Sequence, residues 1–160
     1  MMKYRLIVLI ILLATPFYCI MGQNQYPRDY FRSPVNFPVT LAGSFGEIRK
    51  NHFHSGIDIR TEGVQGKPVY AIADGYVSRV NISPGGFGKA LYITHPNGYT
   101  SLYGHLRGYA GAIATWARAQ QFKQESFAID MEVPQGLLKV KTKLLRHQFL
   151  PQILAHRALG

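Results

Sequence analysis

The stretch Val69-Tyr-Ala-Ile-Ala-Asp-Gly-Tyr-Val-Ser-Arg-Val-Asn-Ile82 carries the clearest fold signal in this chain. Its apolar run 69–73 predicts a short strand, which ends at Asp74-Gly75, a dipeptide typical of tight turns. Apolar and polar residues then alternate over 76–82, which is the pattern of a half-buried strand. Together the two runs predict a β-hairpin at the centre of a β-rich domain.

The same pattern continues toward the carboxyl end of the chain. Residues 83–88 (Ser-Pro-Gly-Gly-Phe-Gly) predict a loop, and residues 90–94 predict the next strand. The Asn97-Gly98 pair then predicts a turn into a strand over 99–103. Short strands joined by Asp-Gly and Asn-Gly turns favour an antiparallel meander.

A single helix and an extended arm complete the predicted domain. Residues 109–122 favour a helix, although Gly108 and Gly111 weaken its start. Residues 23–40 are polar and rich in proline and aromatic side chains, which indicates an extended arm before the domain. The predicted fold class is therefore mainly β, an antiparallel sheet domain over 41–141 with one inserted helix.

Length, composition and charge limit the classes of partner. The chain has 160 residues and a hydrophobic fraction of 47%, enough for one modest domain with its own core. Its formal net charge is +10, from 18 Lys and Arg against 8 Asp and Glu, which favours anionic partners such as acidic lipids or cell-wall polymers. No basic helix and no nucleic-acid motif is visible, so we expect no nucleic-acid partner.

Residues 1–22 have the pattern of a secretion signal. Lys3 and Arg5 precede the apolar run 6–14, which is shorter than the roughly 20 residues that a membrane span needs. We expect export to the periplasm or the extracellular cell envelope; the alternative is an uncleaved signal segment, which would be the only membrane contact. Cys19 is the only cysteine, so any metal in the mature domain must be held by histidine and carboxylate side chains.

The segment His54-Ser-Gly-Ile-Asp58 is the sharpest local feature. Imidazole nitrogen and carboxylate oxygen are ordinary zinc ligands, and a catalytic zinc takes three protein ligands and a water. Gly56 and the surrounding β pattern predict a bent strand or loop, so the two side chains converge only if that bend turns them together. Taken alone, this spacing is common by chance, and a satisfied surface pair is the better interpretation of it.

Four segments together resemble the lysostaphin-type, or LytM-like, zinc endopeptidases, which cut peptide cross-links of bacterial peptidoglycan. The resemblance covers about residues 44–140, and its motifs keep their order and spacing. They are Phe45-Gly-Glu-Ile-Arg-Lys-Asn-His-Phe-His-Ser-Gly-Ile-Asp-Ile59, Pro68-Val-Tyr-Ala-Ile-Ala-Asp-Gly-Tyr-Val77, Gly88-Lys-Ala-Leu-Tyr-Ile93 and His95-Pro-Asn-Gly-Tyr-Thr-Ser-Leu-Tyr-Gly-His-Leu106.

The resemblance implies specific roles for a few side chains. His54 and Asp58 match the first two ligands of Zn2+, and His105 matches the catalytic histidine that does not bind the metal. Such an imidazole orients the attacking water or stabilises charge on the attacked carbonyl. Tyr103 is a weaker candidate for the substrate groove. His95 begins the Pro-Asn-Gly turn and is predicted to shape it.

The family's third zinc ligand is missing from its expected place. Family members carry a His-x-His pair on a late strand after a glycine-rich loop, and this chain has no His-x-His. Residues 142–160 instead form a divergent basic tail, in which His147 and His156 are nine residues apart. We expect no strand there, and therefore an exposed sheet edge beside the site.

Two accounts of this tail stand side by side. Codons for Ile153-Leu-Ala-His-Arg-Ala-Leu-Gly160 can be chosen so that a frame two nucleotides later reads Thr-Gly-Ser-Ser-Gly-Pro-Gly, close to the expected loop. On this account the tail is an out-of-frame product. Alternatively the tail is genuine and forms a short basic helix over 143–150, which is weakly amphipathic.

Two functions follow from these observations. The first is a secreted zinc metallo-endopeptidase that hydrolyses peptide cross-links of peptidoglycan, with His54 and Asp58 on zinc and His105 assisting. The second is a catalytically degenerate module that binds cell-wall peptide or regulates another wall hydrolase, which the missing third ligand favours. Zinc content and cleavage of peptidoglycan peptides separate the two.

Overall fold

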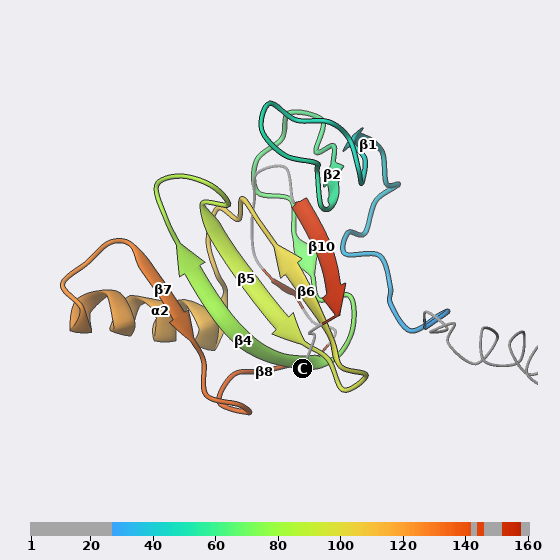
Figure 1. The fold of residues 1–160 in the computed structure, drawn as a ribbon. Helices are drawn as coiled ribbons and strands as arrows, with labels where there is room; N and C mark the ends of the chain where they lie inside the picture. Colours follow the sequence, from blue (N-terminus) through green and yellow to red (C-terminus); the bar gives the residue numbers. More distant parts are fainter. Residues whose placement is uncertain (1–26, 142–143, 146–151, 158–160) are drawn as a thin grey trace, which may run out of the picture. The chain divides into compact units, whose positions relative to one another are not determined.

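A single antiparallel sheet is the main feature of the computed structural model, which describes residues 27–141, 144–145 and 152–157. The described residues form an eight-stranded sheet in the order β1-β2-β10-β6-β5-β4-β7, with β8 paired to β4 as well (Figure 1). Every pair of neighbouring strands is antiparallel. The strands are β1 Leu41–Gly43, β2 Ile57–Ile59, β4 Gly75–Ile82, β5 Lys89–Thr94, β6 Tyr99–Tyr103, β7 Ile129–Glu132, β8 Lys139–Val140 and β10 Gln152–Arg157.

The core lies on the central strands β4, β5 and β6. Val77 and Val80 of β4 are both fully buried although they are three residues apart. A β-bulge between Val77 and Arg79 shifts the register of β4 against β5, so both valines face the core despite their odd spacing. Leu91 and Ile93 of β5 keep the regular alternation and are buried beside them.

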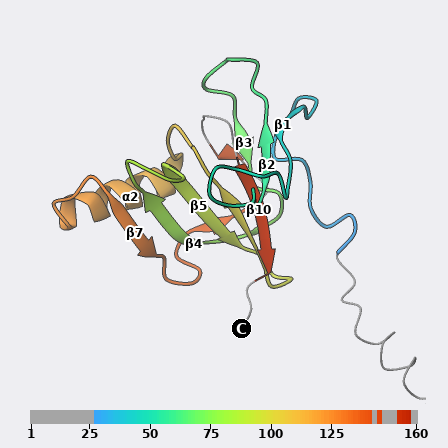
Figure 2. The same cartoon turned by 45° about the horizontal axis from the view of Figure 1, so that its top comes forward.

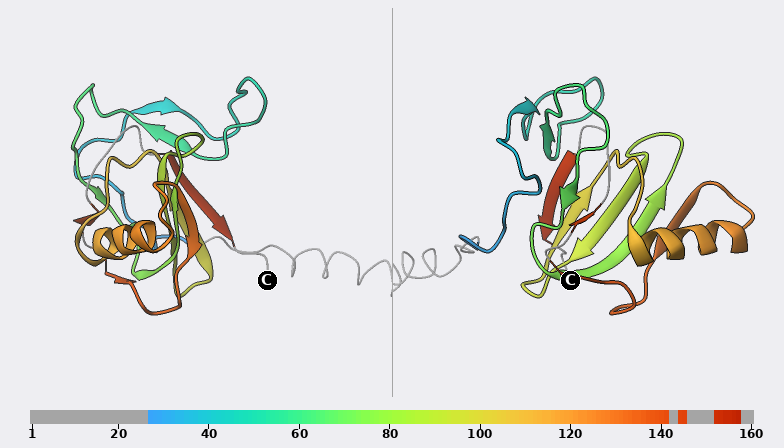
Figure 3. Two further views of the ribbon diagram at one scale, coloured as in Figure 1. Left: turned by 90° about the vertical axis from the view of Figure 1, so that its left-hand side faces the viewer. Right: turned by 180° about the vertical axis from the view of Figure 1, so that it is seen from behind.

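The described residues contain one helix, α2 Gly111–Lys123. Ile113 and Ala117 are its buried residues, and their spacing of four places them on one face of the helix. Figure 3 shows α2 lying alongside the sheet, next to β7 and β4. The Tyr109 hydroxyl, just before α2, hydrogen-bonds the carbonyl groups of Asn81 and Ala90 and so ties the start of this segment to β4 and β5. The predicted fold class, mainly antiparallel β with one inserted helix, is confirmed.

The predicted hairpin over residues 69–82 is wrong, because the first strand pairs elsewhere. β3 Val69–Tyr70 forms a separate two-stranded sheet with β9 Leu144–Leu145 rather than pairing with β4. The backbone after β3 is satisfied by other groups. The Ile72 N–H donates to the Tyr103 hydroxyl at 2.9 Å, and the Ile72 carbonyl accepts from the Arg32 N–H at 2.8 Å. No ladder with β4 is needed to satisfy these groups.

The predicted turn at Asn97-Gly98 is confirmed. It joins β5 to β6, and its glycine has a φ of +82°, a left-handed conformation that glycine adopts without steric cost. The Gly98 N–H donates to the His95 carbonyl, and the His95 N–H donates to the Tyr99 carbonyl. Local turn chemistry was therefore sufficient to predict this hairpin.

The predicted exposed edge beside the site is also wrong, because β10 fills the position between β2 and β6 (Figure 2). Gln152 pairs with Asp58, and Ile153 pairs with both Ile57 and Tyr103. Since β10 is antiparallel to each neighbour, β2 and β6 run parallel to one another and face the gap with unpaired backbone groups. A strand in the gap satisfies those groups, which outweighs the weak helical pattern of the tail. Of the segment 143–150, where a helix was predicted, residues 144–145 form β9 and the others lie outside the described residues.

The arm before β1 is extended in the part that the structure describes. Residues 31–40 form no helix or strand, yet the Pro34 carbonyl accepts from the Tyr70 N–H and Val35 is buried in the core. Met1–Tyr30 form a separate unit, and residues 1–26, with the predicted signal segment, lie outside the described residues. Within the described part of the chain, no helix has the length and apolar character to cross a membrane.

Candidate metal centre

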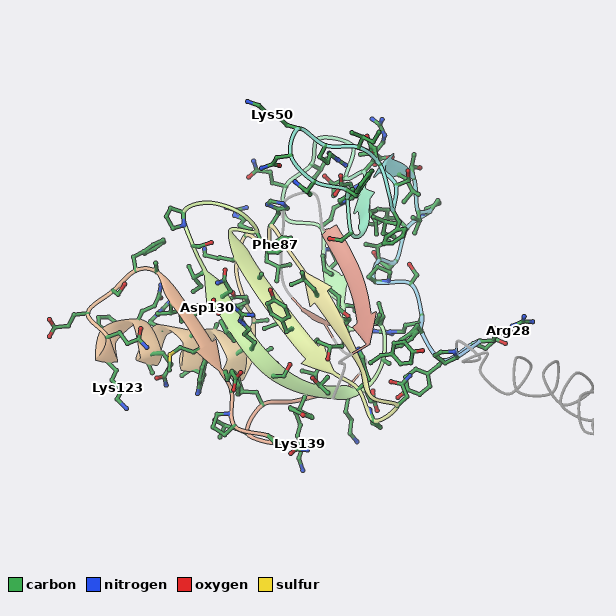
Figure 4. The ribbon with its side chains drawn as sticks, in the orientation of Figure 1. Arg28, Lys50, Phe87, Lys123, Asp130 and Lys139 are labelled. Carbon is green, nitrogen blue, oxygen red and sulfur yellow. The ribbon has the colours of Figure 1, made fainter. Side chains whose placement is uncertain are left out.

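A short hairpin between β1 and β2 positions His54. The bridge between Ile48 and Phe53 closes this hairpin, and the backbones of Glu47 and His54 are hydrogen-bonded beside it. Because side chains alternate across an extended strand, Ile48 and Phe53 lie on one face, and Glu47, Arg49 and His54 lie on the other. Ile48 and Phe53 are strongly exposed, whereas His54 is buried. Figure 4 shows the charged residue Lys50 at the tip of the hairpin.

The hydrogen bonds of His54 fix which ring nitrogen is available. Its Nδ1 lies 2.9 Å from the Ser44 carbonyl oxygen. Because a carbonyl only accepts, Nδ1 carries a proton, so in the neutral form of the ring the lone pair is at Nε2. That Nε2 atom is buried and has no hydrogen-bond partner.

Asp58 is held in a complementary way. It lies in β2 opposite Gly43, and its Oδ2 accepts from Arg49 Nη2 at 2.7 Å. Its other oxygen, Oδ1, is buried without a hydrogen-bond partner and lies 3.3 Å from His54 Nε2. The structure thus brings the two predicted zinc ligands together, each with one atom committed to the protein and one atom free.

This arrangement fits a metal cation. With the His54 ring neutral, two buried lone-pair atoms face each other, which is unfavourable; a bound cation, like a proton on Nε2 that completes the ion pair, removes that cost. In tetrahedral zinc sites with ligand distances of 2.0–2.2 Å, neighbouring ligand atoms are about 3.4 Å apart. The observed separation of 3.3 Å between His54 Nε2 and Asp58 Oδ1 agrees with this spacing. The described part of the chain contains no group of three or more His, Cys, Asp or Glu side chains that could hold a metal.

His105 lies at the end of β6, in the loop that leads to α2. Its N–H donates to the carbonyl of Phe87 at 2.7 Å, and its φ of +54° is a left-handed conformation that non-glycine residues rarely adopt. Figure 4 labels Phe87 in the loop between β4 and β5. The shared partner Ile153 sets Tyr103 level with Ile57, two strand spacings apart, which is roughly 9–10 Å. Continuing this register by one residue sets Gly104 level with Asp58, and His105 is the next residue along the chain.

Tyr103 does not line a substrate groove, contrary to the sequence prediction. Its side chain has no exposed surface, and its hydroxyl accepts from the Ile72 N–H and lies 3.1 Å from the Ser101 hydroxyl. Burial raises the pKa of this phenol, which therefore remains protonated. The role of Tyr103 is to join β6 to the segment after β3.

His95 has a larger role than shaping a turn. The ring is buried, its Nδ1 donates to the Asp74 carbonyl at 2.8 Å, and its Nε2 lies 2.9 Å from the Ser101 hydroxyl. Sequence reasoning missed this network, because the partners are 21 and 6 residues away and are brought together only by the sheet. Both ring nitrogens are occupied, so His95 is not available to a metal.

The histidines of the tail do not complete the site in the described structure. His156 lies four residues along β10 from Gln152, the partner of Asp58, so its backbone is about 13 Å farther along the strand. His147 lies outside the described residues. His52 is exposed and hydrogen-bonds the neighbouring Asn51 side chain at 2.7 Å.

A cavity of about 670 Å³ lies beside β1 and the end of β2. It is lined by residues such as Phe37, Ala42, Arg60 and Val64, and none of the predicted site residues is among them. The cavity is therefore not the space in front of His54 and Asp58.

Comparison with known proteins gives a match over the segment that carries the site. The family model described as peptidase family M23 matches residues 52–121, which include His54, Asp58 and His105. The DD-carboxypeptidases/endopeptidases Mpg of Neisseria meningitidis serogroup B and of Neisseria gonorrhoeae are each 42% identical to this chain over 91 residues. The aligned part is 57% of this chain and 20% of each relative, so the chain spans about a fifth of the length of these relatives.

Two solved structures resemble the chain at lower identity. A mutant catalytic domain of the prophage-encoded M23 protein EnpA from Enterococcus faecalis is 17% identical, with a TM-score of 0.48 over 81% of this chain and 88% of that one. A zinc containing peptidase from Vibrio cholerae is 22% identical, with a TM-score of 0.46 over 80% of this chain and 37% of that one.

Proposed function

We propose that the protein is a LytM-like peptidase of family M23, whose model matches residues 52–121, and that it acts as an exported zinc metallo-endopeptidase that hydrolyses peptide cross-links of bacterial peptidoglycan. In this proposal His54 and Asp58 hold Zn2+, and His105 assists hydrolysis. The matching relatives are named as DD-carboxypeptidases/endopeptidases, which supports a peptide substrate in the cell wall.

The pair of unpartnered atoms, His54 Nε2 and Asp58 Oδ1, is the observation that carries the proposal. Both atoms are buried, they are 3.3 Å apart, and the opposite atom of each side chain is held by the protein. A site that merely stabilised the fold would satisfy these atoms with hydrogen bonds. Their orientation toward each other supports a missing cation.

The residues of the site have distinct tasks in hydrolysis. When bound, zinc supplies a Lewis acid that activates water and polarises the scissile carbonyl. The Ser44 carbonyl keeps the His54 proton on Nδ1 and so leaves Nε2 free as a ligand. His105 is the side chain expected to orient the attacking water or to stabilise charge on the attacked carbonyl oxygen.

Charge and the predicted signal segment support a cell-envelope substrate. The formal net charge of +10 favours association with anionic wall polymers. This attraction would hold the protein close to its substrate. Residues 1–22 have the sequence pattern of an export signal, consistent with action in the periplasm or outside the cell. The arm 23–40, the peptidase domain 41–141 and the tail 142–160 remain our proposed division of the chain.

One observation favours a second function, a degenerate module that binds cell-wall peptide without cutting it. The described residues supply two zinc ligands where catalytic sites use three. A two-ligand site binds metal weakly unless a residue beyond the described part completes it. If no residue completes the site, the chain would keep the peptide-binding surface typical of the family but would not hydrolyse the peptide.

The test measures zinc and hydrolysis on the same preparations. The full chain is equilibrated with zinc, dialysed and analysed for metal, and is then incubated with purified peptidoglycan whose cross-linked fragments are followed by mass spectrometry. We expect about one zinc per chain and conversion of cross-linked fragments to monomers. His54→Ala should lose both, whereas His105→Ala should keep the zinc and lose roughly 10²–10⁴-fold in rate.

His52→Ala is the matched control, because His52 is exposed and lies two residues from His54. It should leave zinc content and hydrolysis unchanged. If the folded chain sediments with peptidoglycan but binds no zinc and releases no monomer, the peptidase proposal is wrong and the binding module is the better account.

A further inference from the structure

Arg49 contacts both predicted zinc ligands from behind. Its Nη2 atom donates to Asp58 Oδ2 at 2.7 Å and lies 3.4 Å from His54 Nδ1. Both contacts are on the sides of the ligands that face away from Nε2 and Oδ1. We propose that Arg49 is a positioning residue that holds Asp58 with one oxygen free for zinc, an inference that rests on the proposed function.

The ion pair decides which oxygen of Asp58 is available. A carboxylate offers two equivalent oxygens, and a charge-assisted hydrogen bond to one of them fixes the rotation of the group. With Oδ2 bound to Arg49, Oδ1 is left 3.3 Å from His54 Nε2. Without Arg49, the carboxylate is free to rotate and to take other partners, so the two ligand atoms lose their common orientation.

A closed set of contacts holds Arg49 itself in place. Glu47 Oε2 accepts from Arg49 Nη2 and from the Ser44 N–H, each at 3.2 Å. The Ser44 carbonyl in turn accepts from His54 Nδ1. The Arg49 N–H donates to the His52 carbonyl across the hairpin. The guanidinium is thus linked to Asp58 directly and to His54 through Glu47 and Ser44.

The neighbouring strand is built around this pair. A Cβ atom at Gly43 would lie 2.3 Å from Arg49 Nη2 and 2.5 Å from Asp58 Oδ2, closer than Cβ contacts occur in proteins. Glycine at this position of β1 lets the arginine and the carboxylate meet against the backbone. Gly43→Ala therefore displaces the pair without removing either charge, which gives a second and independent way to disturb it.

A role in folding alone predicts no change in zinc binding, so zinc affinity is the readout that identifies a positioning role. The Arg49 side chain is 34% exposed but that of its partner Asp58 is only 11% exposed, so removing Arg49 leaves a nearly buried carboxylate without its partner and should also lower stability. Residues that orient metal ligands typically change metal affinity by about 10- to 100-fold when they are replaced. The expected defect of an Arg49 variant is thus a loss of zinc affinity in the folded chain in addition to a loss of stability.

The chain offers a closely matched control. Arg79 of β4 forms a bidentate ion pair with Asp130 of β7, and its side chain is 44% exposed. This pair has the same chemistry and lies at the opposite edge of the sheet from β2 (Figure 1). Arg79→Met removes an ion pair without touching the metal centre.

The experiment measures the zinc dissociation constant of the full chain in metal buffers, together with the absorption spectrum of the cobalt(II)-loaded protein. We expect Arg49→Met to weaken zinc binding of the folded chain by about 10- to 100-fold and to change the cobalt spectrum, whereas Arg79→Met should leave both unchanged. Arg49→Lys should recover part of the affinity, because lysine supplies the charge but not the planar guanidinium. Gly43→Ala should weaken zinc binding in the same direction.

The outcomes separate this inference from the proposed function. A wild-type chain that binds no zinc overturns the zinc site and the inference with it. A wild-type chain that binds zinc, with Arg49→Met or Gly43→Ala binding equally well, overturns the positioning role alone. So does an equal loss of affinity in Arg79→Met. If Arg49→Met fails to fold, Gly43→Ala and Arg49→Lys decide the question by the same readouts.

Discussion

Single atoms distinguish His54 and His95, the two deeply buried histidines in the described part of the chain. His54 and His95 are 3% and 2% exposed, and each donates Nδ1–H to a backbone carbonyl. The difference is at Nε2, which in His95 lies against the Ser101 hydroxyl and in His54 has no partner. An imidazole with both nitrogens hydrogen-bonded stabilises the fold, whereas one with an unpartnered nitrogen beside a carboxylate oxygen is a candidate metal ligand.

His95 makes stability depend on pH. Burial is the largest effect on this ring, and it lowers the pKa of His95 below its ordinary value of 6.5, partly offset by the hydrogen bond to the Asp74 carbonyl. The unfolded chain therefore binds a proton at His95 more readily than the folded chain does, so protonation favours unfolding. The contribution is present above about pH 6.5 and is lost as pH falls through the lowered folded pKa.

The prediction is a lower free energy of unfolding at pH 5 than at pH 7.5, measured by urea titration. His95→Asn cannot titrate and should reduce the difference between the two pH values. An identical pH difference in the wild type and in His95→Asn would contradict the assignment of this effect to His95.

Among the elements, β10 connects the two strands that carry the candidate site residues. It joins β2, which carries Asp58, to β6, which leads into His105. Without a strand in this position, β2 would be paired only with the short β1, and the two candidate site segments would belong to separate parts of the sheet. The geometric relation between the metal ligands and His105 is therefore set by an element from the tail.

A proline in β10 tests the contribution of its pairing with β2 and β6. At Ile153, β10 is paired on both sides, so the backbone N–H faces a partner strand whichever way it points. Ile153→Pro removes that donor and leaves an acceptor unpaired, which should cost about 1–3 kcal/mol of unfolding free energy. Ile153→Ala keeps the donor and serves as the comparison in urea unfolding. If proline and alanine destabilise equally, the pairing of β10 at this position does not contribute to stability.

At the scale of the whole molecule, the proposed zinc site would link metal binding to folding. A ligand that binds only the folded chain stabilises it according to its saturation, by about 2.7 kcal/mol at a free concentration 100 times the dissociation constant. The two proposed zinc ligands come from the hairpin after β1 and from β2 itself, which unfolding would separate. The stability of the domain should therefore rise with free zinc.

This prediction is checked by thermal unfolding with zinc and after removal of zinc by a chelator. The melting temperature should fall on removal and should recover when zinc is added back in excess. His54→Ala should melt at one temperature under both conditions. Equal zinc-dependent shifts in the wild type and in His54→Ala would assign the metal effect to a different site.

The sequence alone determined the features that depend on near neighbours. The alternation over 76–82, the Asn97-Gly98 turn and the helical pattern over 109–122 correspond to β4, the β5–β6 hairpin and α2. The family resemblance selected His54 and Asp58, and the matching family model spans both. These signals are local, because turn chemistry and side-chain period are properties of a few consecutive residues.

Only the tertiary structure decided which distant segments meet. The pairing of β3 with β9, the place of β10 between β2 and β6, and the burial of Tyr103 all depend on backbone groups that seek partners far along the chain. The same holds for Arg49, whose contact with Asp58 exists because a hairpin and β2 fold against Gly43. Backbone hydrogen bonding and close packing must be satisfied over the whole domain at once, so no short stretch of sequence determines which distant segments pair.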